Sequence, residues 1–112
     1  MPVNTVELVR IVDNFRELDP NMGAQIMLVF LTIARHGTCT QRDLSLELGM
    51  TEGSASRAVA YWSDTRFDKQ DGMDMIERFE DPRDRRYKML RLNAKGRLFY
   101  EKLKAIGGSR RA

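Results

Sequence analysis

Four basic side chains gather in a short stretch of the chain, at Arg83, Arg85, Arg86 and Lys88, around the carboxylate of Asp84. An arginine guanidinium is a planar, permanently charged fork of donors, which suits phosphate oxygens and the electronegative floor of a narrow minor groove. Asp84 can orient one guanidinium through a bidentate pair, or act only as a turn residue. The cluster predicts contact with a polyanion, and a solvated surface turn is the alternative that it leaves open.

The segments on either side of this cluster predict a β-hairpin that presents it. Residues 75–80 predict a strand that runs into the turn signal Asp81-Pro82, and residues 84–92 predict the returning strand. Asn93 can then cap a final helix. We expect its inner face to consist of Leu98, Phe99, Leu103 and Ile106. Residues 107–112 are expected to form a flexible basic tail.

Charge is distributed unevenly along the chain. The formal net charge is +3, yet residues 83–112 hold 11 Lys/Arg against 2 Asp/Glu, whereas residues 1–82 hold 8 against 14. A positive field in the C-terminal third favours a nucleic acid as partner there. No apolar run approaches the roughly 20 residues of a membrane span, and the N-terminus lacks a secretory signal. A cytoplasmic protein without membrane contact is therefore expected.

The N-terminal third predicts two helices. A capping box of Asn4 and Glu7 begins the first, and the Pro after Asp19 ends it; residues 22–35 predict the second, which is central. The first helix carries two apolar rows, more than one packing partner needs, so we expect it to form a dimer contact. The expected dimerisation residues are Leu8, Ile11, Val12, Phe15 and Leu18.

The middle of the chain predicts a helix-turn-helix. A short helix capped by Thr40 ends at Gly49, and a second helix spans residues 51–64. Its predicted buried stripe is Ala55, Val59 and Trp62. Arg57 lies on the opposite face, where it can bond a guanine edge or a phosphate, or simply pair with a neighbouring carboxylate.

Small polar residues and one arginine make this second helix the candidate reader of the major groove. The candidate readers are Thr51, Ser54, Ser56, Arg57 and Tyr61. The candidate phosphate contacts, at the start of the preceding helix, are Thr38, Thr40, Gln41 and Arg42. The dipole of a helix N-terminus favours an anion there, although Thr40 would cap that helix in any case.

Over roughly residues 24–103 the sequence resembles the MarR family of winged-helix transcriptional regulators. Residues 44–59 match its helix-turn-helix. Residues 76–96 follow its wing signature, an Asp with an Arg two positions on and a closing apolar-x-Leu-Thr-x-x-Gly pattern, with Asn93 in place of the Thr. The resemblance implies a mainly α-helical α+β fold with a small β-hairpin, a winged helix-turn-helix with N- and C-terminal flanking helices. It also implies a symmetric dimer that places recognition helices in major grooves and wing arginines in minor grooves.

The sequence departs from the family pattern in two places. The link into the wing, through residues 68–72, is longer than usual, and the C-terminal helix stops where family members continue into another dimerisation helix. Dimerisation is therefore expected to depend on the N-terminal helix. Whether a small-molecule effector binds stays undecided.

Catalytic and metal-binding patterns are missing from the sequence. There is a single His, with no nucleophile-base pairing, no Gly-rich phosphate loop and no calcium-loop spacing, so we expect no catalytic residue, metal or cofactor. Cys39 fits packing against Leu44 better than redox sensing.

We expect residues 1–106 to form one winged-helix domain that binds double-stranded DNA as a dimeric, nucleoid-associated repressor. Helix 51–64 would read the major groove and wing 75–92 the minor groove. A phage or plasmid replication, partition or packaging factor is one alternative, and a protein-interaction winged helix is another.

Overall fold

The structure, a computed structural model, describes residues 4–64 and 71–108, which form five helices and a three-stranded antiparallel sheet. The elements are α1 (Thr5–Leu18), α2 (Ala24–His36), β1 (Cys39–Thr40), α3 (Gln41–Leu48), α4 (Glu52–Trp62), β2 (Ile76–Asp81), β3 (Asp84–Leu92) and α5 (Ala94–Gly108). The strand order is β1-β3-β2, with Cys39 opposite Leu90. The expected α+β winged helix-turn-helix is confirmed, with β1 as a strand that the sequence did not indicate.

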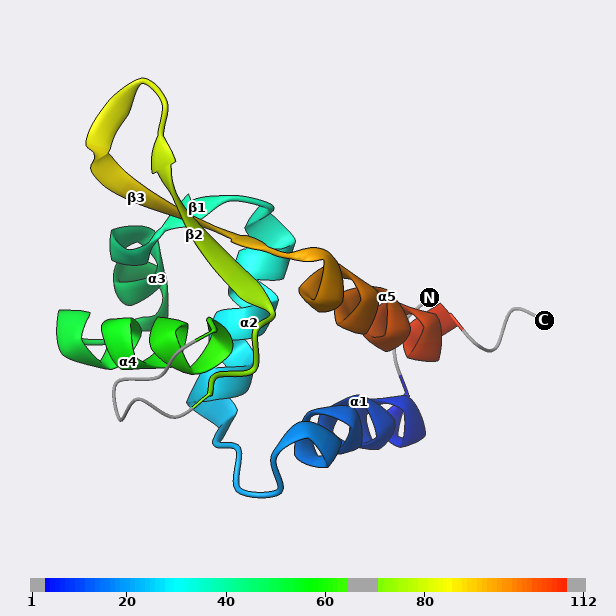
Figure 1. The fold of residues 1–112 in the computed structure, drawn as a ribbon. Coiled ribbons are helices and arrows are strands. Elements are labelled where there is room, and N and C mark those ends of the chain that lie inside the picture. Colours follow the sequence, from blue (N-terminus) through cyan, green and yellow to red (C-terminus); the bar gives the residue numbers. More distant parts are fainter. Residues whose placement is uncertain (1–3, 65–70, 109–112) are drawn as a thin grey trace.

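The elements are arranged around α2 (Figure 1). Helices α1 and α5 lie together at one end of the molecule, α3 and α4 lie at the other end, and α2 runs between them. The β2–β3 hairpin projects outward past α3. The fold therefore separates the helix-turn-helix and wing from the two flanking helices.

Side-chain caps fix the helix starts that the sequence predicted. Asn4 Oδ1 accepts from the Glu7 amide at 2.8 Å while Glu7 Oε1 accepts from the Asn4 amide at 2.9 Å, which completes the capping box of α1. Thr51 Oγ1 accepts from the Ser54 amide at 3.0 Å and begins α4. The residues of each cap lie three positions apart in the sequence, so this spacing was enough to predict where the helices begin.

Helix ends differ from the predictions by a few residues. Helix α4 ends at Trp62 rather than at residue 64, because the backbone at Ser63 becomes extended. Helix α5 continues through Gly108, so Gly107 and Gly108 do not belong to the expected tail. The rest of that tail, residues 109–112, lies outside the described residues. Residues 65–70, which include the first part of the link into the wing, lie outside them as well.

An aromatic cluster forms the centre of the core. Phe30 packs against Trp62 with ring centroids 4.9 Å apart, and Phe15 packs edge-on against Phe99 at 5.3 Å. The predicted stripe of Ala55, Val59 and Trp62 is fully buried. The prediction for Leu98 was wrong, since it is 73% exposed. The buried face of α5 consists of Phe99, Leu103 and Ile106. Leu98 precedes Phe99 and so points about 100° away from it around the helix axis.

Helix α1 divides its apolar residues between this core and the surface. Phe15 is only 1% exposed, while Ile11 and Leu18 are partly buried against the same core. Phe15 therefore belongs to the core of the protomer, and Ile11 and Leu18 contribute to it, while the assignment of these residues to a dimer contact stays a prediction. The exposed apolar residues, 45–67% accessible, are Val6, Leu8, Val9 and Val12. We call this set the α1 apolar face.

A close backbone approach connects the end of α4 to the start of the wing and of α5. The Met75 amide donates to the Trp62 carbonyl at 2.8 Å, and a Cβ at Gly96 would lie 2.1 Å from the Met75 carbonyl oxygen. A Cβ at Gly72 would lie 1.9 Å from the Ser63 carbonyl oxygen. Glycine is required at both positions because no side chain fits.

Among the helices that the structure describes, none combines the length and the apolar character that a membrane span needs.

Candidate nucleic-acid interface

The outer face of α4 presents the predicted recognition residues. Thr51 and Arg57 are exposed, and Ser54 and Ser56 are half-buried. The Arg57 guanidinium donates to Ser54 Oγ at 3.5 Å, near the first turn of the helix. Arg57 forms no ion pair with Glu52 or Asp64, all three being described residues. Its remaining donors are therefore available to an acceptor outside the chain.

Tyr61, the fifth predicted reader, is placed differently. It lies in the last turn of α4, half-buried, and its hydroxyl donates to Asp19 Oδ2 at 2.6 Å. Its ring packs edge-on against Trp62 with centroids 5.4 Å apart. Tyr61 thus connects α4 to the turn between α1 and α2, and we leave it out of the proposed readers.

The wing tip contains the predicted pair of Asp84 with an arginine. Arg86 Nε donates to Asp84 Oδ1 at 3.0 Å and Arg86 Nη2 to Asp84 Oδ2 at 2.7 Å, a bidentate geometry. Hydrogen bonds from the Arg86 side chain and then from its backbone hold the pKa of Asp84 below its ordinary value. Arg86 remains 86% exposed, and Arg85 beside it is exposed as well. One guanidinium is oriented while its neighbour is left unconstrained.

The other two basic residues of the predicted cluster, Arg83 and Lys88, form weak surface pairs. Arg83 Nε lies 3.6 Å from Asp81 Oδ1, and Lys88 Nζ lies 3.6 Å from Glu80 Oε1 on the paired strand. The Arg83 side chain is 92% exposed. Exposed pairs of this length contribute little, about 0–1 kcal/mol. Phosphate oxygens could therefore replace these carboxylates at small cost.

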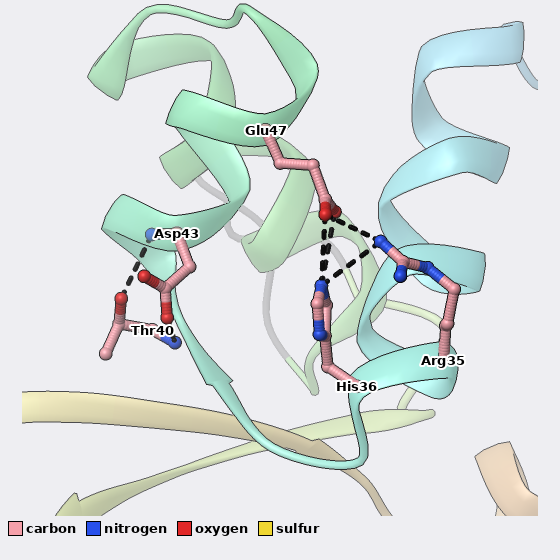
Figure 2. A network of polar contacts seen from close by, with 5 residues as sticks. All are labelled: Arg35, His36, Thr40, Asp43 and Glu47. Atoms are coloured by element: carbon pink, nitrogen blue, oxygen red, sulfur yellow. Dashed lines mark hydrogen bonds and ion pairs between the residues drawn. The ribbon is translucent and has the colours of Figure 1, made fainter.

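The start of α3 is less suited to a phosphate than the sequence suggested (Figure 2). The Thr40 side chain accepts from the Asp43 amide and the Asp43 carboxylate accepts from the Thr40 amide, both at 3.0 Å. These hydrogen bonds, the backbone one first, hold the pKa of Asp43 below its ordinary value, so a negative charge already occupies the helix N-terminus. Thr40 acts as a cap. Exposed Thr38 and Arg42 stay candidates, and Gln41 is half-buried.

A polar network between α2 and α3 was not found by sequence reasoning (Figure 2). Arg35 Nη2 donates to Glu47 Oε1 at 2.6 Å, and His36 Nε2 lies 3.2 Å from the same oxygen. The Arg35 hydrogen bond is the main cause of the lowered pKa of Glu47. Partners 11 or 12 residues apart on different helices leave no periodic signal, so only the fold reveals them.

Cys39 has the environment of a packing residue. It is 5% exposed, and burial, followed by the nearby charges of Asp43 and Glu47, raises its pKa to about 11. A redox-sensing cysteine needs an accessible thiolate, which this environment disfavours. The described part of the chain holds no group of three or more His, Cys, Asp and Glu side chains arranged to bind a metal ion.

Comparisons with known proteins identify the fold through structure. Neither family models nor curated protein sequences match the chain. Among solved structures, FabT from Streptococcus pneumoniae in complex with DNA has a TM-score of 0.69 at 24% identity, over 96% of this chain and 69% of that one. A mutant of MarR from E. coli complexed with operator DNA has a TM-score of 0.65 at 19% identity, over 94% and 71%.

A third structure, YusO from Bacillus subtilis, has a TM-score of 0.66 at 12% identity, over 93% of this chain and 67% of that chain. The chain thus spans about two thirds of the length of these structures. The fold is the winged helix of MarR-type structures, so the resemblance inferred from the sequence is confirmed at the level of fold.

Proposed function

We propose that this protein is a sequence-specific transcriptional regulator that binds double-stranded DNA as a homodimer, in the cytoplasm and at the nucleoid. The observation that carries the proposal is the wing tip, where exposed Arg85 and Arg86 extend from the same winged helix-turn-helix that exposes Arg57 on α4. FabT and MarR, which share this fold, have been solved with DNA. Arg57 would bond base edges in the major groove and the wing would enter the minor groove.

Repression by occlusion of a promoter is the simplest consequence of such binding. The position of the wing tip supports this orientation on DNA, because exposed Arg83, Arg85 and Arg86 lie at the turn of the hairpin that projects past α3, at the end of the molecule away from α1. A DNA-facing end and a partner-facing end are thereby separated.

The α1 apolar face is the proposed dimer contact. Val6, Leu8, Val9 and Val12 form exposed apolar surface on a helix whose other side already packs into the protomer. Contiguous exposed apolar surface of this kind marks an interaction site. We propose that a second copy of the chain covers this face, because a dimer places two recognition helices on two half-sites.

The binding proposal is tested by selecting duplexes from a random double-stranded library with the full chain. Recovery of a two-fold symmetric sequence, with half-sites 10–10.5 base pairs apart or a multiple of that, is the expected result. Footprinting on genomic DNA then identifies the controlled gene. Enrichment of no sequence would refute sequence-specific binding.

The dimer proposal is tested by light scattering of Val9→Glu at micromolar concentration. A charge in the α1 apolar face should give a monomer, whereas wild type should be a dimer. Leu46→Glu is the matched control, since Leu46 is 70% exposed on α3, outside the proposed contact. A monomeric wild type, or a Val9→Glu dimer as stable as wild type, would contradict the model.

A further inference from the structure

The last turn of α4 is fixed to a distant turn by a short hydrogen bond. Tyr61 Oη donates to Asp19 Oδ2 at 2.6 Å, across 42 residues of sequence. Because the acceptor is a carboxylate, this bond is of the stronger, charge-assisted kind. It connects α4 directly to the segment that joins α1 to α2.

Both partners of this bond are held in place by other contacts. Asp19 Oδ1 accepts from the Asn21 amide at 3.0 Å, and the Asp19 amide donates to the Phe15 carbonyl at 3.2 Å. On the other side, the Tyr61 ring packs against Trp62, whose indole Nε1 donates to the Ile26 carbonyl at 2.8 Å. The carboxylate and the hydroxyl therefore meet as two fixed groups, so their bond constrains the helices that carry them.

This contact lies between the two ends of the molecule. Asp19 directly follows α1, which carries the α1 apolar face, and Tyr61 belongs to α4, which carries Arg57. In a dimer formed through α1, the direction of α4 relative to α1 determines the separation of the two recognition helices. That separation must match successive major grooves, about 34–36 Å apart.

We propose that Asp19 and Tyr61 are positioning residues: their hydrogen bond fixes α4 relative to α1 and so sets the half-site spacing that the dimer accepts. The inference rests on the proposed function, and it gives Tyr61 a role in binding that requires no contact with DNA. Loss of the bond leaves α4 folded, because the buried stripe of Ala55, Val59 and Trp62 is untouched. The direction of α4 becomes less restricted.

The experiment uses the full chain and three duplexes. One is the sequence selected by wild type, and the others carry one base pair inserted or removed at its centre. Tyr61→Phe and Asp19→Ala should each weaken binding to the native spacing by about five- to tenfold. Binding to the altered spacings should fall less, so that the preference for native spacing shrinks. The double variant should bind no more weakly than Asp19→Ala, because Asp19→Ala already removes the bond to Tyr61.

Two further variants distinguish positioning from general loss of stability. Asp19→Asn retains an acceptor oxygen and should restore much of the spacing preference. Tyr100→Phe is the matched control, since it removes a tyrosine hydroxyl from α5 that hydrogen-bonds to none of the described residues. Its spacing preference should equal that of wild type. All affinities are measured at a temperature where each variant is fully folded by circular dichroism.

Three outcomes would overturn the inference. If Tyr61→Phe weakens binding while Asp19→Ala does not, Tyr61 contacts DNA itself. If both variants lose affinity equally at every spacing, the bond does not set the spacing. If wild type binds the selected duplex and neither variant changes it, the bond has no role in binding. A wild type that binds no duplex would instead refute the proposed function, and the inference with it.

Discussion

Replacing Arg57 by Ala should separate DNA reading from folding. In the folded chain the Arg57 side chain is exposed, and its hydrogen bond to Ser54 is a long one, at 3.5 Å. Its loss should change the free energy of unfolding by no more than about 0.5 kcal/mol. A bidentate contact with a guanine edge is worth about 1–3 kcal/mol. A symmetric dimer makes that contact twice, so binding should weaken by about 2–6 kcal/mol, at least about 30-fold.

The assay is a competition titration of wild type and Arg57→Ala against the selected duplex, every single-base variant of it and a random duplex. Arg57→Lys keeps the charge and loses the planar fork, so it should retain random binding and lose base discrimination. Lys102→Ala is the control, because Lys102 is an exposed basic residue of α5, outside α4, the wing and the α1 apolar face. It should bind like wild type.

Base reading by Arg57 predicts relaxed discrimination at one base pair in each half-site, with the two positions about 34–36 Å apart or a multiple of that. An equal loss on the selected, variant and random duplexes would refute the reasoning and leave Arg57 with a phosphate contact only. A large fall in the thermal midpoint of Arg57→Ala would refute the claim that reading and folding are separable.

Three further predictions concern stability and reactivity. Cys39, buried and with a pKa of about 11, should react with iodoacetamide at about pH 8 only after the protein is unfolded; fast alkylation of the native chain would contradict this. Gly72→Ala should destabilise the fold by about 1–3 kcal/mol, because its methyl group would lie 1.9 Å from the Ser63 carbonyl oxygen, and an unchanged denaturant midpoint would refute the close approach. The hydrogen bond from Arg35 lowers the pKa of Glu47 in the folded state. The ionised Glu47 carboxylate therefore stabilises the folded protein at a pH above its unfolded pKa, and this stabilisation is lost as the pH falls through its folded pKa. Between neutral pH and about pH 3, the thermal midpoint should therefore fall less for Glu47→Gln than for wild type. An equal fall in both proteins would show that Glu47 does not contribute to the loss of stability in acid.

Local rules predicted most of the fold. The caps at Asn4, Thr40 and Thr51, together with the buried stripe of α4, depend on spacings of three or four residues, and the structure confirms each. The wing was predictable because a turn signal separates two strands, and the pairing of Arg86 with Asp84 involves near neighbours. Short-range interactions are encoded within the segment that makes them.

The missed features depend on contacts between distant segments. Strand β1 is two residues long and exists because Cys39 and Thr40 pair with β3, which no local pattern specifies. Tyr61 follows Arg57 by one helical turn and was assigned to the same face, yet Asp19 approaches the end of α4 and holds its hydroxyl. Leu98 was misplaced because an apolar residue beside a buried one looks the same in sequence whether it is buried or exposed.

The most direct test of the central claim is the salt dependence of binding to the selected duplex. If the wing contacts phosphates, the logarithm of the affinity should fall linearly with the logarithm of salt concentration, by about 0.9 per phosphate contact in each decade. Replacing both Arg85 and Arg86 by Ala should weaken binding and reduce that slope by about one unit for each phosphate that the wing no longer binds. Wild-type binding that does not respond to salt, or an affinity and slope unchanged in the double variant, would contradict a DNA-binding wing.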